Sequence, residues 1–326
     1  MALIFFSGGE SGTPDFTTNG LVTCSTAQVK TGTYSLYFVN TPGATLDFPS
    51  ALTEFFFSCA LYISSSGSPT AIVDFRNAAG TSVVSLRYNS SVTPWQLFVG
   101  ANSVATGICL ATHSAWRVIE IHVKIHSSNG LIHFRVNGLD DAIFAGNTAS
   151  VSSSVTRFYS GTTGWGYHMD DLIINDTTGP INNSWMGGSR IVAIRPIGPG
   201  SLTQWTPSTG ANWQCVDEKP ISATDYVSSN IAGSIDLYDL ASLPAGVCSL
   251  DSILGVKVFN SMSRSGVTTS YVQNALRTNS VNSFSSSFAV PLIDTLENTI
   301  LDLNPITGLT WTYSDINALE VGVKLV

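Results

Sequence analysis

The chain of 326 residues and 34.6 kDa is long enough for about two domains, and with 44% hydrophobic and only 11% charged residues it is too apolar for intrinsic disorder. Its 14 Lys and Arg against 22 Asp and Glu give a net charge of -8, which argues against nucleic acid as a partner because phosphate contacts need basic side chains. Abundant Ser, Thr and Asn together with 28 Gly are typical of strands joined by tight turns, so the composition predicts an all-β protein.

The beginning of the chain has the pattern of neither an export signal nor a membrane span. Residues 2–6 are apolar, but no basic residue precedes them and the run is too short for the core of a signal peptide. The long apolar stretch at residues 55–63 falls well short of the roughly 18 residues that a transmembrane helix needs. We therefore expect no membrane insertion and synthesis in a cytosol, where the 5 Cys stay reduced.

The first half of the chain contains many short segments in which apolar and polar residues alternate. The clearest is residues 116–126, where every second residue from Ile119 to Ile125 is apolar. Asn129-Gly130 and a second alternating run at residues 131–136 follow it, which predicts an antiparallel hairpin. Similar segments are residues 34–39, 55–63, 70–75, 83–88, 95–99, 155–159 and 169–174. So many strands in one unit predict a sandwich or jelly roll.

Residues 175–183 are polar turn-formers without periodicity, and we place the domain boundary there, so that residues 1–177 form the first domain and residues 178–326 the second. Strand-like patterns return at residues 190–196, 234–240, 253–259, 268–277 and 320–326, which predicts a second, smaller β-sandwich. Residues 253–259 and 268–277 are expected to form a hairpin. One short helix is expected before Leu319, with Ser314 as N-cap and Asp315 in its first turn.

Several motifs of the first 177 residues resemble those of concanavalin A-like lectins and glucanases, a group that includes laminin G-like domains. These motifs are residues 116–123, 134–138 and 169–176. In the second half, residues 213–220, 233–238, 253–264 and 310–324 look like C-terminal regions of virion proteins of tailed bacteriophages. The resemblance implies a jelly roll followed by an assembly or anchoring domain, in a tail, baseplate, fibre or capsid-decoration subunit. It also implies synthesis in a host cytoplasm and location in the virion. The expected partners are other virion proteins and further copies of the chain in a homo-oligomer, with a trimer as the first expectation.

Aromatic residues in turn-like surroundings are the best candidates for ligand binding. Residues 161–168 contain Trp165, Tyr167 and His168 among several Gly, and Trp95 follows a proline. An aromatic ring at the rim of a sandwich stacks well on the apolar face of a sugar, so these four side chains are the predicted site for a host-surface glycan. The alternative interpretation is that the rings close the ends of the sandwich or an oligomer interface.

Acidic residues and histidines give weaker candidates for a metal site. Asp170 and Asp171 carry oxygen ligands that suit calcium, as acidic loops do in some laminin G-like domains, and their alternative role is structural hydrogen bonding. Apart from such a calcium ion, we expect no cofactor. His122, His126 and His133 share the polar face of the expected hairpin, which suits either a surface metal site or a solvated strand face.

No sequence pattern indicates catalysis. Retaining glycanases need two carboxyl groups about 5 Å apart, whereas Glu120 is the only carboxylate of its predicted strand. We therefore expect a non-enzymatic bacteriophage virion structural protein that acts by oligomeric assembly and adheres to host-surface glycans through its jelly roll. The alternative is a carbohydrate-binding, lectin-like module for receptor recognition, and a glycan hydrolase is the third hypothesis.

Overall fold

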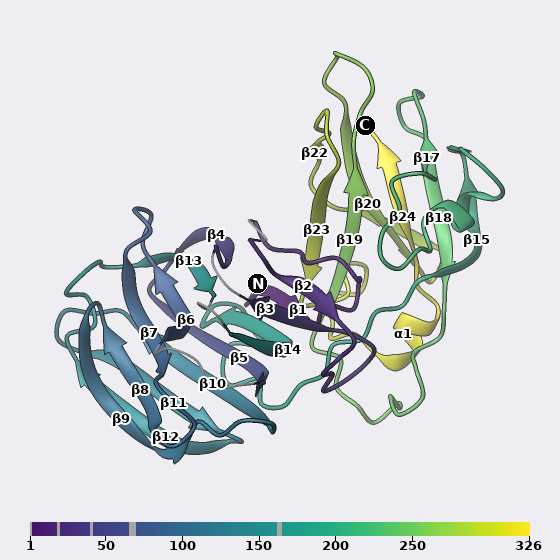
Figure 1. Ribbon diagram of the computed structural model, residues 1–326. Coiled ribbons are helices and arrows are strands. Elements are labelled where there is room, and N and C mark those ends of the chain that lie inside the picture. The colour runs from purple at the N-terminus through teal and green to yellow at the C-terminus, as the bar shows by residue number, and fades with distance from the viewer. Residues whose placement is uncertain (1, 18–19, 40–41, 65–69, 162–164) are drawn as a thin grey trace. The chain divides into compact units, whose positions relative to one another are not determined.

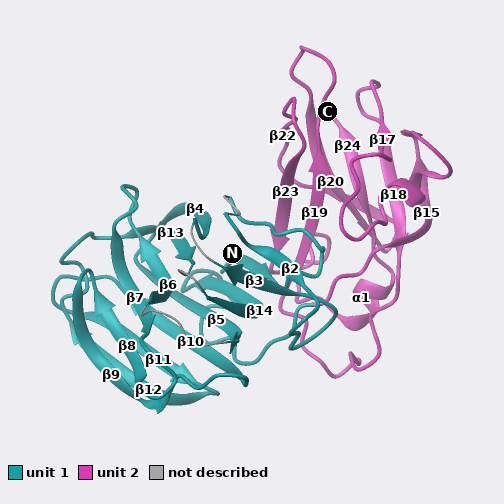
Figure 2. Ribbon diagram, in the orientation of Figure 1, with its two compact units in different colours: residues 1–191 teal, residues 192–326 magenta. Residues whose placement is uncertain are grey.

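The computed structural model describes residues 2–17, 20–39, 42–64, 70–161 and 165–326 of the chain. Nearly all of its regular structure is β-strand, as the composition predicts. The chain divides into two compact units, residues 1–191 and residues 192–326, which Figure 2 shows in different colours. Among the described residues, no helix has both the length and the apolar character needed to cross a membrane.

Unit 1 is a jelly-roll sandwich of two sheets, whose strands are labelled in Figure 1. The larger, eight-stranded sheet contains β1 (Leu3–Ser7), β2 (Thr23–Ser25), β3 (Ser35–Val39), β5 (Glu54–Ile63), β10 (Trp116–Lys124), β11 (Gly130–Val136), β12 (Leu139–Gly146) and β14 (Gly166–Asp176). Its order is β12-β11-β10-β5-β14-β3-β2, and β1 also pairs with β14. The six-stranded sheet contains β4 (Ala44–Leu52), β13 (Val155–Ser160), β6 (Thr70–Arg76), β7 (Ser82–Tyr88), β8 (Pro94–Val99) and β9 (Asn102–Leu110), in that order. The predicted all-β sandwich is confirmed.

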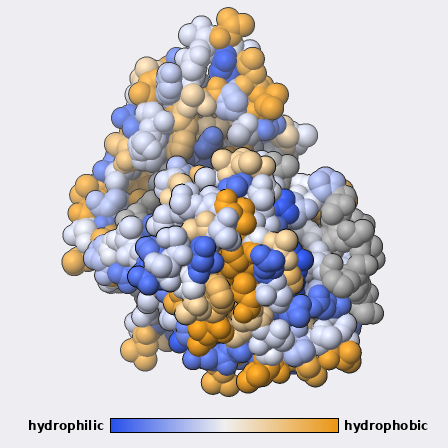
Figure 3. All heavy atoms as spheres, turned by 90° about the vertical axis from the view of Figure 1, so that its left-hand side faces the viewer, coloured by the Kyte–Doolittle hydropathy of each residue, from blue (hydrophilic) through white to orange (hydrophobic). Residues whose placement is uncertain are grey.

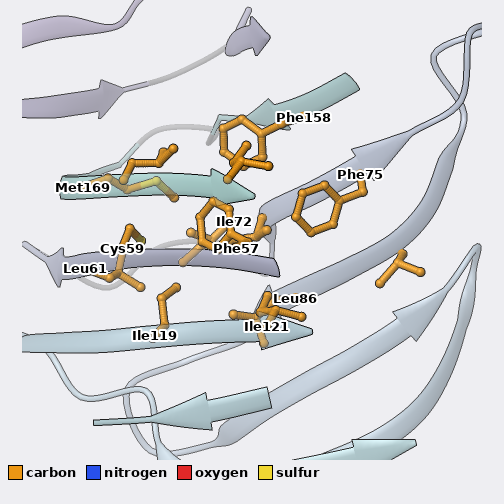
Figure 4. Close-up of a cluster of buried hydrophobic side chains, with 14 of the residues drawn as sticks. Phe57, Cys59, Leu61, Ile72, Phe75, Leu86, Ile119, Ile121, Phe158 and Met169 are labelled. Atoms are coloured by element: carbon orange, nitrogen blue, oxygen red, sulfur yellow. The ribbon is translucent and has the colours of Figure 1, made fainter. Parts of the chain in front are cut away.

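The core of unit 1 lies between the two sheets, because every second side chain of a strand points to the same face. In β10, Ile119 and Ile121 are at most 1% exposed, as the alternation predicts. Figure 4 shows how side chains of the two sheets meet. Phe57 of β5 lies 5.5 Å from Phe158 of β13 and 5.9 Å from Phe75 of β6, measured between ring centres. Burial of these large apolar side chains is the main force that holds the sheets together.

The predicted pairing of residues 116–126 with residues 131–136 is confirmed. Strands β10 and β11 are antiparallel, with His122 opposite His133. Strand β11 continues into β12 through Asn137 and Gly138, which both have positive φ angles of 51° and 78°. A two-residue hairpin turn favours this conformation because it matches the twist of the strands.

Residues 182–191, called the strap below, run across the outer face of the eight-stranded sheet. Asn175 Nδ2 in β14 donates to the carbonyl oxygens of Asn182 (2.7 Å) and Ser184 (2.8 Å). The Gly187 N–H donates to Glu120 Oε1 in β10 over 2.9 Å. The chain after residue 177, which we expected in the second domain, therefore packs on unit 1, and the compact unit extends to residue 191.

Unit 2 is a smaller sandwich. Its six-stranded sheet has the order β15 (Pro196–Thr203), β18 (Ile235–Leu240), β24 (Glu320–Leu325), β20 (Tyr271–Thr278) and β21 (Val281–Phe284), with β22 (Phe288–Ala289) also beside β20. Two-stranded sheets are formed by β19 (Val256–Met262) with β23 (Thr295–Leu301) and by β16 (Thr206–Pro207) with β17 (Val227–Ser228), and the helices are a 3-10 turn (Asn212–Cys215) and α1 (Tyr313–Asn317). Val258 of β19 and Leu276 of β20 share a buried cluster with Trp311, Ile316 and Leu319, so the β19-β23 sheet covers the larger one.

Two expectations for unit 2 are wrong in detail. Strands β19 and β20 do not form a hairpin, because β19 pairs with β23 while β20 pairs with β24 in the other sheet. Helix α1 has Thr312 as its N-cap instead of Ser314. Thr312 Oγ1 accepts from the Asp315 N–H (3.1 Å) and the Asp315 carboxylate accepts from the Thr312 N–H (2.9 Å). These two hydrogen bonds satisfy the backbone N–H groups of Thr312 and Asp315, which explains why the helix is capped by Thr312.

Candidate functional site

Four ring-bearing side chains form a row on the outer face of the eight-stranded sheet. They are Tyr37 of β3, His168 of β14, Tyr62 of β5 and Trp116 of β10. The register aligns them across four neighbouring strands, because His168 lies opposite both Tyr37 and Tyr62, and Tyr62 lies opposite Trp116. The strand neighbours of Tyr37, Tyr62 and His168 belong to the core, so these three point away from it. Trp116 also points outward, because the core side chains of β10 are the odd-numbered Ile119, Ile121 and Val123. We call this set the aromatic row.

The rings of the aromatic row touch one another. Tyr37 and His168 stack with ring centres 4.6 Å apart. Tyr62 lies 6.2 Å from His168 and 5.4 Å from Trp116, separations at which aromatic pairs attract. The Tyr and Trp rings are partly exposed, whereas His168 is only 3% exposed. The row therefore presents partly exposed rings on β3, β5 and β10, with the largely covered His168 of β14 between Tyr37 and Tyr62.

Gly166 makes room for one end of the aromatic row. A Cβ atom at this position would lie 2.5 Å from Tyr37 Oη and 2.6 Å from Tyr37 Cε2. Real Cβ atoms do not approach other atoms so closely, so any larger residue would push the Tyr37 ring aside. The glycine allows the ring to lie flat along β14.

The hydrogen bonds around His168 determine which ring nitrogen carries the proton. Ser35 Oγ donates its hydrogen to the Gln28 carbonyl oxygen, 2.6 Å away. Ser35 Oγ must therefore accept from His168 Nδ1, at 2.9 Å. Burial lowers the pKa of His168 to about 4, so the ring is neutral at pH 7. Its Nε2 then carries a lone pair, to which no described residue donates.

Three of the residues predicted to form a glycan platform do not lie at the surface. Trp95, Trp165 and Tyr167 are at most 4% exposed. Trp165 packs against Tyr88 (4.9 Å between ring centres) and Tyr167 (5.7 Å), and Trp95 packs against Tyr88 (6.3 Å). The expected presentation of these rings to a sugar is therefore wrong. Alternation turns Trp95 of β8 and Tyr167 of β14 inward, and Trp165, directly before β14, is buried by its packing on Tyr88 and Tyr167. Residues 162–164 of the expected loop lie outside the described residues.

The remaining predicted residue, His168, is the centre of the aromatic row. Its partners Tyr37, Tyr62 and Trp116 were not among the predicted site residues. All three belong to predicted strands, and the signal that could have found them is their place between core-facing neighbours in the alternation. That signal gives the face of the sheet on which each ring lies, but not which strands are adjacent.

Asp170 and Asp171 lie where the register of β14 shifts, and both are buried. Asp170 Oδ2 accepts from the N–H groups of Lys30 (2.8 Å) and Thr31 (3.1 Å). Asp171 Oδ1 accepts from Thr31 Oγ1 (2.9 Å) and from the Ile191 N–H (2.7 Å). These bonds tie the loop before β3 and the end of the strap to β14. Burial, with the adjacent Asp171 charge, raises the pKa of Asp170 to about 7.

The Glu10 carboxylate is the third that binds the loop before β3. Its Oε1 accepts from the N–H groups of Thr33 (2.9 Å) and Tyr34 (2.8 Å). In the part of the chain that the structure describes, no group of three or more His, Cys, Asp or Glu side chains is placed to hold a metal ion. Calcium binding by Asp170 and Asp171 stays a prediction, in which their four carboxylate oxygens would be the ligands.

Trp185 fixes the strap on the outer face, away from the aromatic row. Its ring centre lies 5.2 Å from those of Phe56 and His133. The Arg135 guanidinium lies 4.0 Å from the same ring centre, in a cation–π contact. This part of the face is therefore occupied by the chain itself.

Two of the three histidines considered for a surface metal site contact carboxylates of this face. His122 Nε2 lies 3.0 Å from Glu54 Oε1, and His133 Nε2 lies 2.7 Å from Asp140 Oδ1. Burial is the main cause that lowers the pKa of His122. His126 Nδ1 accepts from the Ser128 N–H, 3.1 Å away. These contacts hold the polar side of the β10-β11 hairpin in place.

Comparisons with known proteins find only weak structural similarities, each of which covers about half of this chain. No protein family and no curated protein matches the chain. Among solved structures, "Cellulose induced protein, Cip1" shares 15% identity and a TM-score of 0.41, covering 53% of this chain and 97% of that one. A Bacillus subtilis protein described as having a galectin-like fold shares 12% identity and a TM-score of 0.34 over 52% of this chain and 98% of that one. Caenorhabditis elegans galectin LEC-6 shares 15% identity and a TM-score of 0.29 over 43% and 94%. At these values no binding property or activity is transferred to this chain.

Proposed function

We propose that unit 1 is a carbohydrate-binding module and that the aromatic row is its stacking surface. The observation that carries the proposal is the alignment of Tyr37, His168, Tyr62 and Trp116 across four adjacent strands. A sugar ring has an apolar C–H face that packs on Tyr and Trp rings, and a row of several rings suits an oligosaccharide better than a single sugar.

His168 gives the row a polar contact that suits a sugar hydroxyl. Its neutral Nε2 accepts a hydrogen bond from a hydroxyl group, while the stacked Tyr37 holds the imidazole in place. A carboxylate or phosphate ligand gains nothing from a neutral acceptor. The row therefore favours neutral glycans, and we propose binding without bond cleavage.

Binding of oligosaccharides to the full chain tests this function. Trp116→Ala and Tyr62→Ala should each weaken binding at least about tenfold, since each removes a stacking ring. Trp213→Ala, in unit 2, is the control and should leave binding unchanged. A broad glycan array without any signal for the full chain, or array signals that survive both ring substitutions, would contradict the proposal.

A second candidate function is assembly into a larger particle, as the resemblance to virion proteins implies. The observation that favours it is a set of exposed apolar side chains where β9 and β12 lie side by side, tied by the Asp141 carboxylate to the N–H groups of Ile108 and Cys109 (3.1 and 2.6 Å). Ile108 is 79% and Leu139 73% exposed. Figure 3, which views the molecule from the side of these strands, shows apolar groups gathered in the middle and along the lower edge of this face.

Native mass by light scattering tests assembly. A discrete oligomer that Ile108→Ser and Leu139→Ser together convert to a monomer would support an apolar interface on this face, and a trimer would match the expected symmetry. A stable monomer across the accessible concentration range would rule out obligatory self-assembly.

A further inference from the structure

A small hollow adjoins the aromatic row, between the eight-stranded sheet and the strap. Its volume is about 40 Å³, and Ala60, Val118, Gly188 and Ser189 are among its lining residues. One water molecule needs about 10–15 Å³ measured in this way, so the hollow accepts a group of roughly three non-hydrogen atoms and no sugar ring.

The strand register places this hollow directly beside the stacking surface. Ala60 lies opposite Val118, and two residues further along the same strands Tyr62 lies opposite Trp116. Residues two apart in a strand share a face and lie about 6–7 Å from one another. A sugar stacked on Tyr62 and Trp116 therefore directs a substituent toward the hollow.

The lining of the hollow combines an apolar floor with free hydrogen-bond donors. The methyl groups of Ala60 and Val118 form part of the sheet side. On the strap side, the Gly187 N–H is used by Glu120, whereas the N–H groups of Gly188 and Ser189 donate to no described acceptor. Such a combination suits a methyl group next to a carbonyl oxygen. Asp171 and Lys30 both line the hollow, so its lining carries one charge of each sign and no excess of positive charge that would favour a sulfate or a carboxylate.

We propose that the hollow receives the acetyl group of an acetylated sugar whose ring stacks on Tyr62 and Trp116. This inference rests on the proposed function and names its ligand class. The acetyl methyl packs on Ala60 and Val118, and the acetyl oxygen accepts from the strap N–H groups. N-acetyl and O-acetyl sugars share this chemistry, so the experiment distinguishes them.

Calorimetric titration of the full chain with paired oligosaccharides tests the inference. Triacetylchitotriose is compared with cellotriose for the N-acetyl group, and O-acetylated xylotriose with its deacetylated form for the O-acetyl group. One acetylated member should bind about tenfold more tightly than its partner, the discrimination that a small buried group provides. A sulfated trisaccharide serves as the anionic comparison.

Gly188→Val fills the hollow and leaves the aromatic row intact. A Cβ at Gly188 would lie 3.7 Å from Val118 Cγ2, an ordinary contact, so the fold is expected to persist. The variant should lose the preference for the acetylated sugar and keep its affinity for the plain one. Gly266→Val, at a position with no atom within 4 Å of the added Cβ, is the matched control and should behave like the unchanged protein.

The outcomes separate the inference from the function on which it rests. Equal affinities within both pairs, a preference that survives Gly188→Val, or a preference for the sulfated sugar overturns the acetyl site while the aromatic row still binds glycan. Absence of binding to every sugar in the unchanged protein overturns both.

Discussion

The Arg135 guanidinium lies 4.0 Å from the centre of the Trp185 ring, so a cation from β11 covers the ring that fixes the strap to unit 1. The ring is also in edge-to-face contact with Phe56 and His133. Cation–π contacts contribute about 0.5–2 kcal/mol, and the loss of apolar packing adds to this when the ring is removed.

Trp185→Ala should therefore lower the free energy of unfolding of unit 1 by about 2 kcal/mol and expose the strap to proteases. Urea unfolding followed by limited proteolysis measures both effects. Tyr226→Ala, at a side chain that is 56% exposed, is the control and should change stability by less than about 0.5 kcal/mol. Unchanged stability and an intact strap in the Trp185 variant would show that the ring does not hold the segment.

The stability of unit 1 should fall as the pH rises from about 5 to 8. The pKa of Asp170 is about 7 in the folded chain against an ordinary value of 3.8, so the folded state keeps a proton that the unfolded state releases. Stability from this group is complete below the unfolded pKa and is lost as the pH passes the folded pKa. Asp171, whose pKa is also raised by burial, acts in the same direction.

Asp170→Asn should flatten this pH dependence and lower the melting temperature at pH 5, because an amide nitrogen in place of Oδ2 no longer accepts from the Lys30 and Thr31 N–H groups. Thermal unfolding between pH 5 and pH 8 provides the measurement. A variant whose melting temperature falls with pH as steeply as that of the unchanged protein would assign the effect to other groups.

The role of Asp170 and Asp171 as calcium ligands leads to a separate prediction. If calcium binds there, millimolar calcium should raise the melting temperature at pH 8 and EDTA should reverse the rise, because an ion that binds only the folded state stabilises it. Asp171→Asn should abolish the response. An identical melting temperature in calcium and in EDTA would leave these carboxylates with the hydrogen bonds described above as their only role.

Gly322 of β24 should not tolerate a side chain. A Cβ there would lie 1.8 Å from the Asp236 carbonyl oxygen in the neighbouring strand β18, and backbone atoms cannot move aside as a side-chain end does. Gly322→Ala should destabilise unit 2 by at least about 3 kcal/mol, a loss typical of severe core disruption. Gly266→Ala provides the matched comparison in urea unfolding, and similar stability of the two variants would contradict the close packing of β18 and β24.

Alternation of apolar and polar residues was enough to predict β10, β11 and most core side chains of unit 1, because one face of each strand is buried. The same pattern places Tyr62 and Trp116 on the outer face. It could not reveal the aromatic row, since Tyr37 and His168 are neighbours only through pairing of strands that are far apart in the sequence. The prediction that Trp165 and Trp95 bind a glycan failed because their glycine and proline neighbours suggested exposed loops. Both rings instead lie in the core.

Long-range pairing also explains the errors in unit 2 and at the domain boundary. Residues 253–259 and 268–277 follow one another in the chain, but β19 finds its partner beyond them in β23. Residues 178–191 have the composition of a linker, but Glu120, Asn175 and Asp171 on the sheet bind backbone groups of this segment and hold it there. Polar residues that bind backbone groups of a distant segment leave no periodic signal in the sequence.

The strap is also the covalent connection between the two units, and its last bond, from the Ile191 N–H to Asp171, lies immediately before unit 2 begins at residue 192. While the strap is bound, the chain is attached to unit 1 up to residue 191. Each residue released from the sheet would add up to about 3.5 Å of free tether. The hydrogen bonds of Glu120, Asn175 and Asp171 thus decide how much of the chain before residue 192 stays attached to unit 1.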